Sequence, residues 1–166
     1  MTKTIIWTVI LSIVAGILQS TVLGKIALYK AVPDLALCIV VYSAYVNGTM
    51  TGQVSGFFSG LLLDFISSAP LGLNCLIRTV IGALTGLFKG SLFLDVFFLP
   101  AVLCMLATIA KAVIYFILYF ISGKTIPAYS FVTPVFWAEL ALNTLSAPLL
   151  FFLLKRIRFL KPGWSN

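Results

Sequence analysis

Two pairs of opposite charges lie inside apolar stretches of this sequence, and their types and spacing limit the chemistry that is possible. Asp64 and Arg78 stand on either side of a Pro-Leu-Gly turn in GLLLDFISSAPLGLNCLIRTVIG, and Lys111 and Glu139 lie in two later apolar runs. Such charges can form ion pairs, bind a polar substrate or relay protons. The sequence has no histidine, and its three cysteines lack paired spacing, so the usual zinc or haem ligands are missing. We therefore predict no catalytic residue, metal or cofactor, and interpret the chain as a non-enzyme.

The composition places these charges in a membrane protein. The chain is 61% hydrophobic and 9% charged, with a mean hydropathy of +1.16, whereas an average soluble domain is about 25% charged. Apolar runs recur from residue 4 to residue 154, so residues 1–166 are predicted to form a single polytopic membrane domain. The net charge of +7 is then attributed to cytoplasmic loops and anionic membrane lipids rather than to nucleic acid.

Six apolar runs are candidate transmembrane helices, because a helix needs about 20 residues to cross a ~30 Å hydrocarbon layer. They cover residues 4–23, 34–46, 53–66, 73–89, 95 or 100 to 122, and 133–154. The segment SLFLDVFFL before Pro100 is predicted to lie along the interface. The predicted fold is an all-α integral membrane protein, a compact bundle of about six transmembrane helices. Five spans remain possible if the short second and third runs form a re-entrant pair.

Basic residues in the loops predict the orientation of the chain in its membrane, because cytoplasmic loops carry the excess of lysine and arginine. With the N-terminus inside, cytoplasmic segments hold Lys3, Lys89, Lys155, Arg156, Arg158 and Lys161, and outer loops hold Lys25, Lys30 and Lys124. Both termini are therefore expected to be cytoplasmic.

Glycines recur every four residues in the third and fourth runs, a spacing that places them on one helix face. They are Gly52, Gly56 and Gly60 in the third run and Gly82, Gly86 and Gly90 in the fourth. Such stripes let transmembrane backbones approach closely. The pairs 52 with 90, 56 with 86, 60 with 82 and 64 with 78 are all centred on Leu71. An antiparallel hairpin folded there would place glycine against glycine and Asp64 level with Arg78.

The purpose of the charges is open from the sequence alone. Asp64 and Arg78 would neutralise each other as a structural clamp, or Asp64 would lie unpaired at the interface, or the two would form a substrate or proton site. Lys111 and Glu139 are expected to form a second ion pair. In the first run, Ser12, Gly16, Ser20 and Gly24 share a face that would pack internally or dock another membrane protein, and Gln19 beside it needs a polar partner.

The chain resembles the bacterial rod-shape-determining MreD family over most of its length. The resemblance is carried by LQS, which contains Gln19, by PDLAL, which begins with Pro33 and Asp34, and above all by GLLLDFISSAPLGLNCLIRTVIGALTG. In that family a glycine-rich span ends in an acid and is followed by a Pro-Leu-Gly turn, here formed around Pro70 and Gly72. The final span and the basic tail match the family only in general character.

The resemblance implies a non-enzymatic membrane subunit of the cell-elongation machinery that supports cell shape. Such proteins look like partners of MreC, a bitopic protein, and through it of the actin-like MreB filament and the enzymes of peptidoglycan synthesis. The family is also similar in architecture to substrate-binding subunits of energy-coupling-factor vitamin transporters. No residue that contacts MreC can be transferred from the family to this sequence.

A substrate-binding subunit of a small-molecule transporter is the alternative function, because it shares the size, hydrophobicity and helix number. It would require a polar pocket open to the outside. Candidate groups for that pocket are Asn74, Arg78, Glu139 and Asn143, which the predicted topology places in outer halves of their spans.

Overall fold

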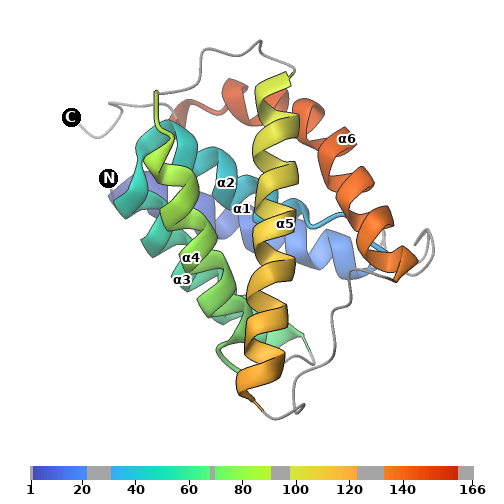
Figure 1. The fold of residues 1–166 in the computed structure, drawn as a ribbon. Helices are drawn as coiled ribbons and strands as arrows, with labels where there is room; N and C mark the ends of the chain where they lie inside the picture. The colour runs from blue at the N-terminus through green and yellow to red at the C-terminus, as the bar shows by residue number, and fades with distance from the viewer. Residues whose placement is uncertain (1, 22–30, 68–69, 91–97, 123–132, 161–166) are drawn as a thin grey trace.

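The computed structural model describes residues 2–21, 31–67, 70–90, 98–122 and 133–160, which form six α-helices and one short 3-10 helix (Figure 1). The helices are α1 (Thr2–Thr21), α2 (Leu35–Asn47), α3 (Thr49–Ile66), α4 (Leu73–Leu87), α5 (Phe98–Ile121), α6 (Pro134–Arg156) and η2 (Arg158–Leu160). These bounds agree with the six predicted apolar runs to about one helical turn, so the all-helical fold is confirmed. The predicted interfacial segment falls mostly on residues 91–97, outside the described residues. Among the described helices, α1, α5 and α6 are long and apolar enough to cross a membrane.

Helix α2 occupies the centre of the bundle. Nine consecutive residues, from Ala36 to Ala44, are buried, and α2 contacts every other α-helix. At 1.5 Å per residue its 13 residues extend only about 20 Å. A helix this short is acceptable at the centre, because protein rather than lipid surrounds it. Gly48, with φ of 100°, forms the turn between α2 and α3, and it is the one residue that separates the two helices.

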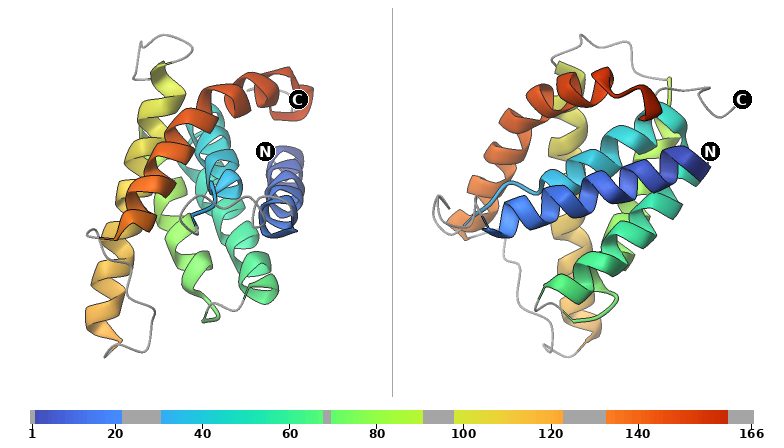
Figure 2. Two further views of the ribbon diagram at one scale, coloured as in Figure 1. Left: turned by 90° about the vertical axis from the view of Figure 1, so that its right-hand side faces the viewer. Right: turned by 180° about the vertical axis from the view of Figure 1, so that it is seen from behind.

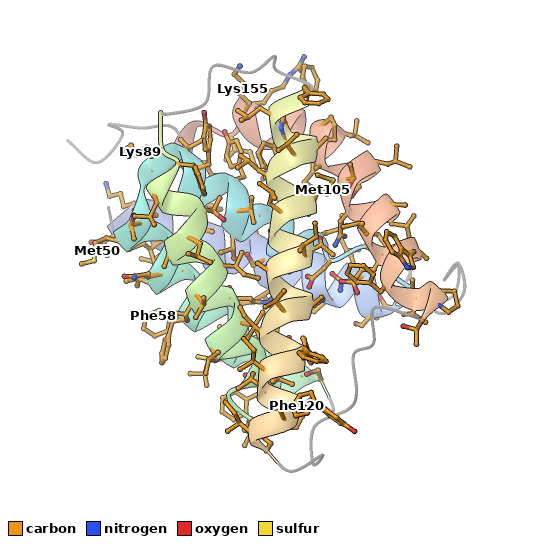
Figure 3. All side chains as sticks on the ribbon, in the orientation of Figure 1. Met50, Phe58, Lys89, Met105, Phe120 and Lys155 are labelled. Atoms are coloured by element: carbon orange, nitrogen blue, oxygen red, sulfur yellow. The ribbon has the colours of Figure 1, made fainter. Side chains whose placement is uncertain are left out.

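The distribution of side chains is the reverse of that in a soluble protein. Large apolar side chains such as those of Phe58 and Phe120 are 49% and 69% exposed and project outwards (Figure 3). Small polar side chains are buried instead; they are Thr4, Thr8, Ser12, Ser43, Thr51, Ser55, Ser59, Thr85 and Thr108. Lipid tolerates an apolar exterior, and small polar side chains between helices can hydrogen-bond to neighbouring helices and backbone carbonyls. The arrangement is that of a membrane protein.

Helix α1 packs along α2 and α3, on the side of the bundle away from α5 (Figure 2). Its inward face is small and polar, and Thr8 exchanges a hydrogen bond of 2.8 Å with Ser43 of α2. Ser12 and Gly16 are buried on this face, where a Cβ added to Gly16 would meet the Leu63 side chain of α3. This part of the small-residue stripe therefore packs internally. Ser20 is exposed, and Gly24 lies outside the described residues.

The α3–α4 hairpin has the predicted close glycine packing in a different register. A Cβ added to Gly52 would meet the Gly82 carbonyl oxygen, and one added to Gly56 would meet that of Arg78. One added to Gly60 would lie 2.6 Å from the Asn74 carbonyl oxygen. The predicted pairs of Gly52 with position 90 and Gly56 with position 86 are therefore wrong by about two helical turns of α4. Gly82 packs against Gly52 instead of against Gly60.

The remaining glycines show the same shift. A Cβ added to Gly86 would meet the backbone of Thr49, at the first turn of α3, rather than that of Gly56. Gly90 lies beyond the end of α4, where no atom of the described residues comes within 4 Å of an added Cβ, so it is not part of the packed stripe.

We expect cysteine cross-linking to distinguish the two registers. In a background without the native cysteines, Cys substitutions at Phe57 and Thr79 should form an intramolecular disulfide, because these positions flank the contact between Gly56 and Arg78 and add no side chain between the two backbones. Cys substitutions at Phe57 and Leu87 should not, because a shift of eight residues along α4 corresponds to about 12 Å, beyond the reach of a disulfide. Gel mobility after mild oxidation measures both. Efficient bridging of the second pair alone would refute the observed register.

Candidate functional site

Asp34 is the centre of a buried charge network. It is the N-cap of α2, where its Oδ1 accepts a hydrogen bond of 3.0 Å from the backbone N–H of Leu37. Arg78 of α4 donates from Nη2 to the same oxygen at 2.7 Å. Lys111 of α5 donates from Nζ to Oδ2 at 2.9 Å. One carboxylate therefore caps a helix and binds two cations.

Helix α6 completes the network through Glu139 and Asn143. Lys111 Nζ lies 2.7 Å from Glu139 Oε1, so the ion pair expected from the sequence is present. One turn further along, Asn143 Oδ1 accepts from the backbone N–H of Asp34 at 2.7 Å, and Asn143 Nδ2 donates to Thr108 Oγ1 of α5 at 2.9 Å. The network thus fixes α4, α5 and α6 to the first turn of the central helix.

The four charged side chains balance one another in a largely buried environment. Asp34, Arg78 and Glu139 are 5%, 4% and 7% exposed, and Lys111 is largely buried. An isolated charge at membrane depth costs at least ~2.5–3.5 kcal/mol on insertion scales. Opposite charges in hydrogen-bond contact reduce that cost, whereas removal of one partner leaves the other uncompensated. The network therefore holds α4, α5 and α6 against the start of α2.

Asp64 does not pair with Arg78, so the predicted clamp between them is wrong. Asp64 is 2% exposed, and its carboxylate accepts from the backbone N–H groups of Gly72, Asn74 and Cys75 at 3.0, 3.0 and 3.1 Å. It also accepts from Asn74 Nδ2 at 2.9 Å. These N–H groups belong to the N-terminus of α4 and have no partner within their helix. A negative charge is favoured there, so Asp64 caps α4.

The Pro-Leu-Gly turn explains why the acid reaches the helix end. The Pro70 carbonyl accepts from the Leu73 N–H at 3.2 Å, and Gly72 adopts the left-handed conformation with φ of 91°. A residue with a Cβ pays a penalty in that conformation. The turn directs the first N–H groups of α4 back towards the last turn of α3, where Asp64 lies. Pro70 and Gly72 therefore support the cap.

Replacement of Asp64 by asparagine should destabilise the α3–α4 hairpin. The variant retains one carbonyl acceptor but loses the charge and the second oxygen, so several N–H groups compete for one partner. We expect the free energy of unfolding to fall by about 1–2 kcal/mol, the upper part of the range of roughly 0.5–2 kcal/mol for lost helix caps. Unfolding of the purified protein by SDS titration measures it. The lipid-facing variant Leu62→Ala on the same helix is the control, and an equal loss in both would argue against the cap.

A polar pocket opens beside the network, where α1 and α3 end and α2 and α4 begin. Its volume is about 310 Å³, and its walls include Gln19, Ser20, Asp34, Asn74, Arg78 and Lys111. The residues identified from the sequence therefore lie in three different parts of the structure. Asp34, Arg78, Lys111 and Glu139 form the network, Asp64 and Gly72 form the cap, and Gln19 lines the pocket. Pro33 precedes the network, where its carbonyl accepts from the Leu35 N–H at 3.0 Å.

The sequence identified the charged residues but missed the central role of Asp34. In the sequence, Asp34 stands out only as the start of a span and as a motif position, although an Asp directly before an apolar run is a typical helix N-cap. Thr108 gave no signal, because a threonine inside a long apolar helix is common in membrane proteins. Only the packing of α5 against α6 brings it to Asn143.

The comparison with protein families agrees with this architecture. A family model described as rod shape-determining protein MreD matches residues 1–157. Neither a search of curated proteins nor a search of solved structures gave a match. The family match covers all six α-helices and includes the Asp34 network, the Asp64 cap and the glycine-packed hairpin. The chain therefore belongs to the MreD family of rod shape-determining proteins.

Proposed function

We propose that this protein is a non-enzymatic membrane subunit of the bacterial cell-elongation machinery. In this role it binds an MreC-like bitopic protein and thereby connects the MreB filament to peptidoglycan synthesis. The family match over residues 1–157 is the observation that carries the proposal. The charge network supports a structural rather than a catalytic role, because its acids and bases neutralise one another through direct contacts.

The proposed location is the inner membrane, which the chain crosses six times with both termini in the cytoplasm. Contacts at one end of the bundle support the even number of crossings. Trp7 of α1 stacks on Phe159 of η2 with ring centroids 4.7 Å apart, so the beginning and end of the described chain lie together. Lys89 Nζ, beyond α4, donates to the Asn47 carbonyl at the end of α2. Lys89 and Lys155 lie at the same end of the molecule (Figure 3).

Reporter fusions should locate these ends. A reporter active only in the cytoplasm, fused before Lys3 or after Asn166, should be active at both positions, because basic residues are retained on the cytoplasmic side. A second reporter, active only outside the membrane and fused at the same sites, is the matched control and should be silent. Activity of the second reporter at one terminus only would refute the even number of crossings, and its activity at both termini would refute the cytoplasmic orientation.

The partner is tested by affinity purification of the tagged protein from native membranes followed by mass spectrometry. We expect a bitopic wall-synthesis protein of the MreC type among the specifically enriched proteins. A tagged, unrelated multi-span protein expressed at the same level controls for membrane proteins that copurify without specificity. Failure to enrich such a partner under conditions that preserve the folded protein would contradict the proposed function. The architectural similarity to energy-coupling-factor subunits stays a prediction, since no solved structure matches.

A further inference from the structure

A second pocket lies between the last turns of α2 and α6 and the first turn of α5. Its volume is about 180 Å³, and an apolar cavity of about 150 Å³ can hold a benzene molecule. Val46 of α2, Leu99 of α5 and Phe151 of α6 contribute apolar walls. The Tyr42 ring packs edge-on against Phe151, with ring centroids 5.0 Å apart, and both residues line the pocket. The interior therefore suits a hydrocarbon group.

Lys155 is the charged residue in this lining. Its side chain is exposed and forms no ion pair with a described residue. The three acids of the described residues are engaged in the charge network and in the cap of α4. The Arg156 guanidinium lies 5.4 Å from the centroid of the Phe152 ring, which also lines the pocket. A second cation therefore lies beside the first, and the pocket attracts a negatively charged group.

The position of Lys155 places its ammonium group at the level of lipid headgroups. Lys155 belongs to the last turn of α6, a helix long and apolar enough to cross a membrane, and lysines near such helix ends extend to the interface. Lys89 lies at the same end of the molecule (Figure 3). Phe151, one helical turn before Lys155, lies deeper in the membrane. The pocket thus extends from the headgroup level towards the hydrocarbon layer.

An anionic phospholipid matches both the charge and the apolar walls of the pocket. A free phosphate ion would contact Lys155 but would leave the apolar walls to water, so that their burial would contribute nothing. A hydrocarbon chain alone would fill the walls but would leave the cation uncompensated. Basic pockets between transmembrane helices bind anionic headgroups, and each lysine or arginine near the surface favours anionic lipids. A phospholipid joins the anion and the chain in one molecule.

We propose that this pocket binds one anionic phospholipid. Its phosphate group contacts Lys155, and the upper part of one acyl chain lies against Val46, Leu99 and Phe151. The lipid thereby contacts α2, α5 and α6 together, at the other end of α2 from the charge network. This binding goes beyond the proposed function and does not depend on it, because the described helices form the pocket without a partner protein.

The test is native mass spectrometry of the full-length protein, released from detergent micelles and titrated with two lipids of identical acyl chains. Palmitoyl-oleoyl phosphatidylglycerol carries a net negative charge, whereas palmitoyl-oleoyl phosphatidylcholine is zwitterionic. We expect the first bound lipid to be phosphatidylglycerol, with a Kd about fivefold lower than that of phosphatidylcholine, as expected for one lysine. Equal Kd values would contradict the proposal. Inorganic phosphate in molar excess should not displace the lipid, and displacement would assign the site to a soluble anion instead.

Variants of exposed lysines assign the preference to the pocket. Lys155→Ala should abolish the preference for phosphatidylglycerol, and Lys155→Arg, which retains the charge, should preserve it. Lys89→Ala is the matched control, because it removes the same charge at the same end of the molecule but outside the pocket lining. An equal loss of preference in Lys89→Ala and Lys155→Ala would show a diffuse attraction of anionic lipid and overturn the proposal. An unchanged preference in Lys155→Ala would do the same.

A substitution that leaves the charge unchanged tests the contact with the acyl chain. Val46→Trp fills the pocket from α2 and should raise the Kd of phosphatidylglycerol at least about fivefold, because the chain loses its buried apolar surface. Leu99→Trp fills the pocket from α5 and takes its place if Val46→Trp does not fold. Unchanged affinity in a folded, filled variant would refute the placement of the chain in this pocket.

Discussion

Replacement of Asp34 by asparagine is expected to cause the largest loss of stability of any single change in the network. The variant leaves Arg78 and Lys111 as buried cations with only Glu139 to compensate them, and it weakens the N-cap of α2. Breaking a buried charge pair by removing one partner costs roughly 3–5 kcal/mol. Unfolding by SDS titration in detergent micelles, together with the yield of folded protein, measures the effect.

A double-mutant cycle tests which acid Arg78 contacts. Asp34→Asn and Arg78→Gln should be strongly non-additive, because the double variant removes both members of a pair that is 2.7 Å apart. Asp64→Asn and Arg78→Gln should be nearly additive, because Asp64 is occupied by the N-terminus of α4. Strong coupling in the second cycle and none in the first would show that Arg78 pairs with Asp64 rather than with Asp34.

Replacement of Gly56 by alanine is expected to have the second largest effect. The added Cβ would meet the Arg78 carbonyl oxygen and would lie 3.1 Å from the Thr79 nitrogen. These are backbone atoms, so a side-chain rotation cannot relieve the contact, and α3 and α4 must separate. Overpacking of this kind typically costs 1–3 kcal/mol. We expect a loss of stability in the upper part of that range, because separation of the helices also moves Arg78 away from Asp34.

The matched control is an alanine at a lipid-facing position of the same hairpin. Val80→Ala on α4, where the side chain is 37% exposed, should change the free energy of unfolding little, because lipid rather than backbone faces it. Thermal denaturation in the same detergent compares the two variants. A Gly56→Ala protein as stable as Val80→Ala would contradict the close approach of α3 and α4.

The sequence by itself determined the features that depend on local composition. The apolar runs located six helices, because a helix in or beside lipid must satisfy its own backbone hydrogen bonds over a sufficient length. The glycine spacing predicted that the third and fourth helices pack closely, and Lys111 and Glu139 were correctly brought together. The motifs around Asp64 also led to the family that the comparison confirms.

The tertiary structure decided the register of the hairpin and therefore the partners of the charges. A symmetric turn centred on Leu71 would place Asp64 opposite Arg78, and the spacing of the glycines fits that register equally well. The actual register is set by the capping of α4: Asp64 must reach Gly72, Asn74 and Cys75. Arg78 then lies too far along α4 for Asp64, and it meets Asp34, which is distant in sequence but placed in the centre by α2. Periodicity defines which face of a helix packs, whereas the offset between two helices depends on contacts made elsewhere in the fold.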